Sequence, residues 1–217
     1  MEEKYSKFKT NNNSVIDKKS VDSFYVKYVK RILDIIISLL VLIVLSPLYL
    51  ILFLGIKIED PKSPVLFKQL RAGKNNIPFY IYKFRSMVEN APKNIPTKDF
   101  IDSDIYITKI GKFMRKTSLD ELPQIFNILK GDMSFVGFRP VILEEVELNK
   151  LREKENANKV LPGITGLAQI NGRDEVGIEE KVEYDKYYCE NISAKLDIKI
   201  FIKTIPVVLM SLGNKDK

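Results

Sequence analysis

The feature that most constrains this chain is an apolar run over residues 32–56, in which Asp34 is the one charged residue. A helix rises about 1.5 Å per residue, so the run is long enough to cross a bilayer if it is straight. Ser46-Pro47 lies in the middle of the run. Because a proline removes one helical hydrogen bond and clashes with the preceding turn, the sequence predicts a kink there.

Basic residues flank this run on both sides: Lys27, Lys30 and Arg31 before it, and Lys57, Lys62 and Lys68 after it. A helix that crosses a membrane usually carries its positive charge on one side. Symmetric positive flanks favour a re-entrant helix, which enters the bilayer, bends and returns to the same face. A spanning helix with a proline kink remains the alternative.

The amino-acid composition restricts which partners the chain can bind and which residues can catalyse a reaction. The 217 residues suffice for one domain, and their net charge of +7 suits a phosphate-rich partner: nucleic acid, an anionic membrane or a phosphorylated substrate. The chain has no histidine and one cysteine, Cys189, which excludes histidine-based triads, a cysteine-rich zinc site and a disulfide framework. Catalysis must therefore rely on carboxylates, Lys, Tyr, Ser or a bound hard cation.

Spacing and turn residues give a coarse map of the other segments. Residues 122–129 carry apolar side chains at helical spacing, with Gly131 just past the end. The other assignments are a flexible polar extension over 1–22, extended segments over 65–67 and 79–82, a loop over 89–104, a charged helix over 141–160 and an apolar surface segment over 196–212.

Two adjacent carboxylates, Asp120 and Glu121, stand where the predicted helix begins. Pro123 restricts the start of that helix, because proline is tolerated only in the first turn. One interpretation is structural: Ser118 and Glu121 fit a capping box, although Pro123 would then lie too deep in the helix. The other interpretation is catalytic, and the residues alone leave both open.

The catalytic interpretation needs cations near these acids. Candidates occur in short motifs along the chain: Lys83, Arg85, Arg115, Arg139 and Arg173. Arginine matches phosphate oxygens with paired donors, and lysine adds a compact charge. Carboxylates and cations of this kind suit phosphoryl transfer assisted by a hard metal such as Mg²⁺.

Ordered motifs identify a family resemblance over roughly residues 28–210. They are Lys30-Arg31-x-x-Asp34, Ser46-Pro47, Phe67-x-Gln69-x-Arg71-x-Gly73, Lys83-Phe84-Arg85-Ser86-Met87, Arg115-Lys116-Thr117-Ser118-Leu119-Asp120-Glu121-Leu122-Pro123-Gln124, Lys130-Gly131-Asp132-Met133-Ser134, Pro162-Gly163-Ile164-Thr165-Gly166-Leu167-Ala168-Gln169, Gly172-Arg173 and Asp197. In this order they resemble the bacterial sugar transferases, specifically the monotopic polyprenyl-phosphate phosphoglycosyl transferases.

The resemblance implies an α+β fold, mostly helical, on the cytoplasmic face of the bacterial inner membrane. The expected parts are the extension over 1–22, a re-entrant membrane helix over 23–59 kinked at Ser46-Pro47, and a small cytoplasmic catalytic domain over 60–217. Amphipathic interfacial helices, including the C-terminal segment, are expected to lie on the membrane. The assembly state is left open, with a homo-oligomer as one option.

The resemblance also implies the reaction. Asp120 is expected to attack the phosphorus that carries the sugar in a UDP-sugar, releasing UMP and forming an aspartyl-phosphosugar. Polyprenyl (undecaprenyl) phosphate then takes the phosphosugar, which starts a surface polysaccharide or glycoconjugate. Glu121 assists, and Mg²⁺ is held by Asp120, with Glu121 as a further ligand candidate. The expected substrate-binding residues are Lys83, Arg85, Arg115, Arg139, Arg173 and Asp197.

The chain departs from the family pattern at two places. Phe138 replaces the first proline of Gly-Pro-Arg-Pro, and Tyr106-Ile107-Thr108-Lys109 replaces an arginine-containing stretch. We expect the first change to adjust loop rigidity, and the second to alter contacts with the donor. Two other functions compete: a non-catalytic membrane adaptor, in which Asp120-Glu121 only caps a helix, and nucleic-acid binding, for which no recognised motif is present.

Overall fold

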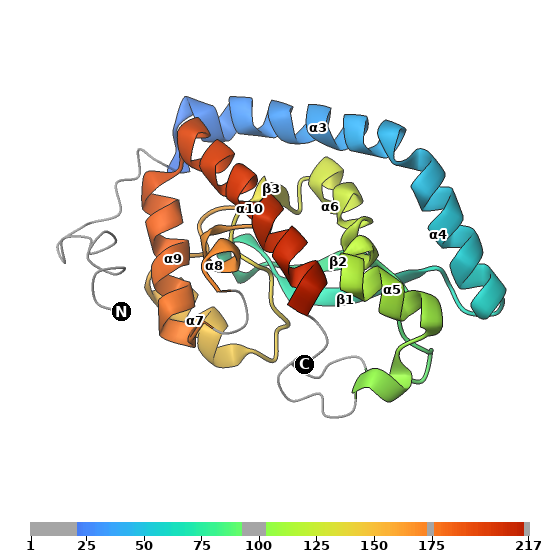
Figure 1. Cartoon of the computed structure of the whole chain (residues 1–217). Coiled ribbons are helices and arrows are strands. Elements are labelled where there is room, and N and C mark those ends of the chain that lie inside the picture. The colour runs from blue at the N-terminus through green and yellow to red at the C-terminus, as the bar shows by residue number, and fades with distance from the viewer. Residues whose placement is uncertain (1–20, 93–102, 173–175, 215–217) are drawn as a thin grey trace.

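The computed structural model describes residues 21–92, 103–172 and 176–214, so the predicted extension over 1–22 lies almost wholly outside the described residues. A long bent helix pair, α3 and α4, forms one edge of the molecule, and the other elements fill the inside of the bend (Figure 1). The described chain is mostly helical with two small sheets, which confirms the mostly helical α+β part of the predicted fold class; the membrane placement of its helices stays a prediction.

The predicted kink is confirmed. Helix α3 (Lys30–Val44), continuous with the short π-helix η2 (Tyr25–Val29), meets α4 (Ser46–Glu59) at a bend of 63°. Leu45 breaks the helix, with φ −92° and ψ 6°, and Pro47 falls in the first turn of α4, where its missing N–H costs no helical bond. The Ser46 hydroxyl donates a hydrogen bond to the carbonyl of Ile43 at 2.9 Å.

Among the described residues, no helix alone combines the length and apolarity needed to cross a membrane, whereas the bent pair meets that requirement when its two arms are counted together. The outward side of the pair is strongly apolar. Its exposed side chains include Ile32, Ile36, Leu40, Ile43 and Val44 on α3 and Leu50, Ile51 and Ile58 on α4. Only Leu52 and Ile56 of α4 are buried against the body.

Two small sheets lie inside the bend. Strands β1 (Leu66–Ala72) and β2 (Pro78–Phe84) form an antiparallel hairpin that includes the predicted segment 79–82 and all but the first residue of the predicted segment 65–67. Strands β3 (Ser134–Val136) and β4 (Gly163–Thr165) pair in parallel. The connection between β1 and β2 passes through a short 3₁₀ turn, η3 (Lys74–Asn76).

The remaining described helices surround these sheets. They are η4 (Ser103–Tyr106), α5 (Lys109–Thr117), η5 (Leu119–Glu121), α6 (Gln124–Lys130), α7 (Val146–Lys154), α8 (Leu167–Ile170), α9 (Ile178–Asn191) and α10 (Ala194–Asn214). Helix α6 confirms the predicted amphipathic helix, and Gly131 ends it with φ 90°. Helix α7 is shorter at both ends than the predicted 141–160: Glu145 before it is non-helical, with ψ 60°, and after its end Asn156 turns the chain away at φ 56°.

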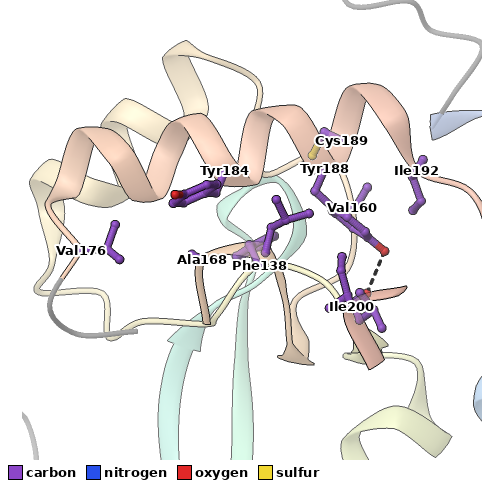
Figure 2. Close-up of a cluster of buried hydrophobic side chains, with 11 residues drawn as sticks. Phe138, Val160, Ala168, Val176, Tyr184, Tyr188, Cys189, Ile192 and Ile200 are labelled. Atoms are coloured by element: carbon purple, nitrogen blue, oxygen red, sulfur yellow. Dashed lines mark hydrogen bonds between the residues drawn. The ribbon is translucent and has the colours of Figure 1, made fainter. Parts of the chain in front are cut away.

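The largest core joins β3 to helices α8, α9 and α10 (Figure 2). Phe138, Tyr184, Tyr188 and Cys189 lie in it, and the Tyr188 hydroxyl donates to the carbonyl of Val136 at 3.1 Å. A second core of Leu52, Ile56, Phe84 and Met114 fixes α4 to β2 and α5. The bent pair is therefore packed onto the body and not attached by its ends alone.

Candidate active site

The two predicted acids lie in a tight turn between α5 and α6. Helix α5 ends at Thr117, Ser118 adopts a left-handed conformation with φ 57°, and η5 then carries Asp120 and Glu121. Pro123 directly precedes α6, as its restriction to a helix start requires. The Ser118 side chain makes no capping hydrogen bond, so the capping-box interpretation is wrong.

Cations from two distant segments converge on Glu121. The Lys83 Nζ atom, on β2, lies 2.7 Å from Glu121 Oε1. Arg139, just past β3, brings its Nη2 atom to 3.7 Å from the same oxygen. The Lys83 and Glu121 side chains are 20% and 21% exposed, so the pair lies partly out of water, where its attraction is less screened.

Asp120 lies in a desolvated environment among charges of both signs. Burial raises the pKa of Asp120, and the negative charge of Glu121 raises it further. The positive charges of Lys83 and Arg115 oppose this shift in pKa. A carboxylate with little water around it and cations beside it is suited to act as a nucleophile toward an anionic phosphate.

Arg71 belongs to the same cluster, although the sequence did not mark it as a site residue. In the β1–β2 register Phe67 faces Lys83, so the alternation of side chains puts Gln69 and Arg71 on the face that carries Lys83. Burial, followed by the charge of Arg139, lowers the pKa of Arg71 to about 10. The sequence feature that could have indicated Arg71 as a site residue was its place in the motif Phe67-x-Gln69-x-Arg71.

The guanidinium of Arg71 has hydrogen-bonding capacity left over. Its Nη2 atom donates to the side-chain oxygen of Gln69 at 2.5 Å. Its Nε atom is buried and has no hydrogen-bond partner in the described part of the chain. A buried donor without an acceptor is costly, which makes Arg71 suited to an anionic ligand that supplies an oxygen.

A hydrogen bond from the buried side of the site holds the main chain of Arg139 in place. Arg152 is almost fully buried and donates from Nη1 to the carbonyl of Arg139 at 3.0 Å. Its guanidinium lies 4.8 Å from the ring centroid of Phe138 and pairs with Asp185. The departure from the family pattern at Phe138 therefore places an aromatic ring in the core, next to the arginine that holds Arg139.

The family model described as bacterial sugar transferase matches residues 25–211 of this chain. The chain belongs to the bacterial sugar transferase family. The match includes the bent pair, the acidic turn between α5 and α6, and the segment that carries Arg139.

Similar curated proteins come from several bacteria. The chain is 40% identical to undecaprenyl-phosphate galactose phosphotransferase of Salmonella typhimurium, with 86% of this chain and 42% of the relative covered. It is 45% identical to UDP-glucose:undecaprenyl-phosphate glucose-1-phosphate transferase of Klebsiella pneumoniae, with 81% and 39% covered. It is 39% identical to the uncharacterized sugar transferase EpsL of Bacillus subtilis, with 85% and 89% covered. The matched region is thus about two-fifths of the first two relatives and most of the third.

Not all of the predicted substrate-binding residues of this family member gather at the acidic turn. Arg85 donates from Nε to the carbonyl of Pro64 at 2.7 Å and influences Asp60, beyond the end of α4. Arg173 lies outside the described residues. Lys83, Arg115 and Arg139 are therefore the predicted cations that the structure brings to the acids.

Asp197 lies in a separate cluster at the first turn of α10. Its carboxylate accepts hydrogen bonds from Tyr25 at 2.7 Å and Tyr188 at 2.6 Å, and forms an ion pair with Lys30 at 2.6 Å. These contacts join α10 to α9 and to the beginning of the bent pair. They give Asp197 a structural role here, and a role in substrate binding stays a prediction.

Within the described residues, no group of three or more Asp, Glu or Cys side chains is arranged to hold a metal ion. Asp120 and Glu121 offer two adjacent carboxylates, and Glu121 is already paired with Lys83. Mg²⁺ usually takes one or two protein carboxylates and completes its shell with water and substrate phosphate oxygens. The acids present fit that mode of binding, in which the substrate supplies the further ligands.

Proposed function

We propose that this chain transfers a sugar phosphate from a UDP-sugar to undecaprenyl phosphate, or a similar polyprenyl phosphate, and so starts a surface polysaccharide or glycoconjugate. The names of the Salmonella and Klebsiella relatives support this class of reaction. A relative from Sinorhizobium fredii, 38% identical, is named an exopolysaccharide production protein. Because the chain spans only part of the first two relatives, the proposal rests on the site itself.

The observation that carries the proposal is the desolvated Asp120 carboxylate, which is under the positive charge of Lys83 and Arg115, with Arg139 paired to its neighbour Glu121. A carboxylate alone repels an anionic diphosphate, whereas this one is accompanied by cations that neutralise the donor. In the first step an Asp120 oxygen attacks the phosphorus that carries the sugar. The bond from that phosphorus to the bridging oxygen breaks, and UMP leaves with the electron pair.

In the second step a phosphate oxygen of the polyprenyl phosphate attacks the same phosphorus. The bond between this phosphorus and the Asp120 oxygen breaks, which releases polyprenyl diphosphate-sugar and restores the carboxylate. Two displacements at one carboxylate let a water-soluble donor and a lipid acceptor use the site in turn. Catalysis then depends on positioning and on charge stabilisation, as in other phosphoryl transfers.

Each nearby side chain has a part in these steps. Arg71 and Arg139 are suited to bind the diphosphate, because paired guanidinium donors match phosphate oxygens. Lys83 holds Glu121 in place and favours the ionised form of Asp120. Mg²⁺, held by Asp120 with Glu121 as a further ligand candidate, would neutralise phosphate charge when bound together with the donor.

The apolar outer surface supports attachment to the membrane. Exposed apolar side chains cover the outward side of α3 and α4, and α10 exposes Ile198, Phe201, Ile202 and Ile205. Apolar surface of this extent is unusual on a protein surrounded by water. We infer a re-entrant, monotopic arrangement at the cytoplasmic face of the inner membrane, with α10 at the lipid surface, where the acceptor phosphate and the nucleotide donor meet.

The test measures UMP release by the full chain in lipid nanodiscs with polyprenyl phosphate and a panel of UDP-sugars. The panel includes UDP-galactose, UDP-glucose and UDP-N-acetylgalactosamine, the sugars named for relatives. At least one donor is expected to yield UMP, and Asp120→Asn is expected to abolish it. Asp22→Asn is the control, because Asp22 pairs with Lys27 at 3.2 Å and both side chains are more than half exposed. Full activity in Asp120→Asn would refute the proposal.

A further inference from the structure

Both arms of the bent helix pair bind directly to the helices that flank the acidic turn. Helices α5 and α6 lie on the inner side of the bend, next to α4 and α3 (Figure 1). Hydrogen bonds link each arm to one of these helices, and a further bond reaches the turn itself. The bent pair therefore contacts the structure that carries Asp120 from two directions.

The first arm, α3, holds the C-terminal end of α6. Arg31 donates from Nη1 to the carbonyl of Ile128 and from Nη2 to that of Leu129, the latter at 2.7 Å. Carbonyls in the last turn of a helix lack the full set of helical donors, so this guanidinium adds donors there, at Leu129 and beside the Gly131 N–H that already reaches Ile128 at 3.0 Å. Asp34 of the same arm accepts from the hydroxyl of Ser134 at 3.1 Å and the N–H of Phe135 at 3.2 Å.

The second arm, α4, holds the N-terminal end of α5. The Glu59 carboxylate accepts hydrogen bonds from the backbone N–H groups of Lys109 at 2.6 Å and Ile110 at 2.9 Å. These N–H groups open the helix and lack helical acceptors, and a carboxylate there complements the helix dipole. Gly55 permits the close approach, because a Cβ atom there would lie 2.2 Å from Ile110 Cδ1.

Between these attachments, Tyr49 of α4 reaches the acidic turn. Its hydroxyl donates to the carbonyl of Leu122 at 2.7 Å, one residue after Glu121 and two after Asp120. The ring is half-buried and packs against Phe84, with ring centroids 5.6 Å apart. The hydroxyl is thus held in a fixed direction, and it fixes the carbonyl that ends the turn.

We propose that Tyr49 is a positioning residue for Asp120: through the Leu122 carbonyl it sets the acidic turn relative to α4 and so relative to the bend. The inference rests on the proposed function, because it concerns the attack by Asp120. Arg31 and Glu59 keep the two flanking helices in place, and Tyr49 makes a direct hydrogen bond from α4 to the turn.

Removing this bond is expected to slow the attack without changing the capacity to bind the donor. A displacement of the nucleophile by about 1 Å can reduce a rate by about a hundredfold. Because Ile125 still donates to the Leu122 carbonyl at 3.1 Å, the turn keeps part of its support. We therefore expect a decrease of about tenfold in the rate of attack in Tyr49→Phe.

The test is the burst of UMP released by the full chain in nanodiscs, with an active UDP-sugar and no lipid acceptor. The burst amplitude reports the fraction of competent protein, and its rate constant reports the attack. Tyr49→Phe is expected to lower the rate constant about tenfold, while the burst amplitude and the donor concentration that gives a half-maximal rate constant stay at wild-type values. Tyr28→Phe, which removes the hydroxyl of an exposed tyrosine in η2, is the control and is expected to match wild type.

Two results would overturn the positioning role: a rate constant within twofold of wild type, or a reduced amplitude with an unchanged rate constant, which indicates loss of folded protein only. Asp120→Asn in the same assay separates the two proposals. If it still gives a burst of UMP, the proposed function fails. If it gives none while Tyr49→Phe behaves as wild type, only the positioning role fails.

Discussion

Replacing Asp185 by asparagine removes the counter-ion of the most deeply buried cation among the described residues. Arg152 contacts Asp185 Oδ2 through Nε at 2.9 Å and Nη2 at 2.8 Å, and the two side chains are 2% and 1% exposed. Breaking one partner of a buried pair costs about 3–5 kcal/mol, because a buried charge is left without compensation. For a chain of this size each kcal/mol shifts the melting temperature by about 2–4 °C, so Asp185→Asn is expected to melt roughly 10 °C lower.

A second ion pair between the same helices provides the matched control. Lys186 of α9 contacts Glu155, just past α7, at 2.9 Å, but these side chains are 29% and 35% exposed. An exposed pair contributes at most about 1 kcal/mol, so Glu155→Gln is expected to shift the melting temperature by about 3 °C or less. Both melts are measured on the detergent-solubilised full chain.

The double variant Arg152→Met/Asp185→Leu tests the physical reason. Burial raises the pKa of Asp185 although Arg152 opposes the shift, so the desolvation of this carboxylate is not fully offset by its partner. Apolar replacement of both partners is then expected to recover most of the stability lost in Asp185→Asn. The reasoning is refuted if Asp185→Asn melts within about 3 °C of wild type, or if the double variant melts below the single one.

Three further predictions concern the site and the bend. Burial raises the pKa of Asp120 in the folded protein above its value in the unfolded chain. The protonated Asp120 carboxyl therefore stabilises the folded state at a pH below the unfolded-state pKa, and this stabilisation is lost as the pH rises through the folded-state pKa. Asp120→Asn should therefore raise the melting temperature at pH 8 but not at pH 3, and an equal effect at both would contradict this. Arg71→Lys should increase the donor KM about tenfold, since it loses paired donors to phosphate, and an unchanged KM would remove Arg71 from the site. Ser46→Ala combined with Pro47→Ala should favour a straight helix and expose an N-terminal tag on the opposite face of the membrane to protease; a tag that stays on the original face would show that the bend does not depend on these two residues.

The bend and the acidic turn could be predicted because each depends on a local constraint. Pro47 cannot donate a hydrogen bond inside a helix, which favours a kink, and it lies in the first turn of α4, whereas Pro206 is accommodated inside α10. Pro123 likewise restricted the start of α6, and this left Asp120 and Glu121 in the turn before it. The ordered motifs then added the family, which the family model confirmed.

The positions of side chains from distant segments could not be read in the same way. Lys83 and Arg85 share one short motif, yet Lys83 contacts Glu121 whereas Arg85 contacts the Pro64 carbonyl, because the chain leaves β2 at Phe84. Asp197 is enclosed by side chains from α9 and the start of the bent pair, which no spacing in the sequence indicates.

The same limit applies to residues that the sequence did not mark. Arg152 and Asp185 are 33 positions apart, and their pairing depends on how α7 packs on α9. Arg71 was visible as part of a motif, but its proximity to Glu121 depends on the register of β1 with β2. Tyr49 is one more apolar-run residue in the sequence, and only the fold brings its hydroxyl to Leu122.

The most direct test of the central claim is to observe the phosphosugar on Asp120. The full chain in nanodiscs is incubated with an active UDP-sugar, quenched, digested and analysed by peptide mass spectrometry. We expect a phosphosugar adduct on the peptide that contains Asp120, which disappears when polyprenyl phosphate is added and never forms in Asp120→Asn. Turnover of the donor to UMP with no adduct on that peptide, or with the adduct on another residue, would contradict the account.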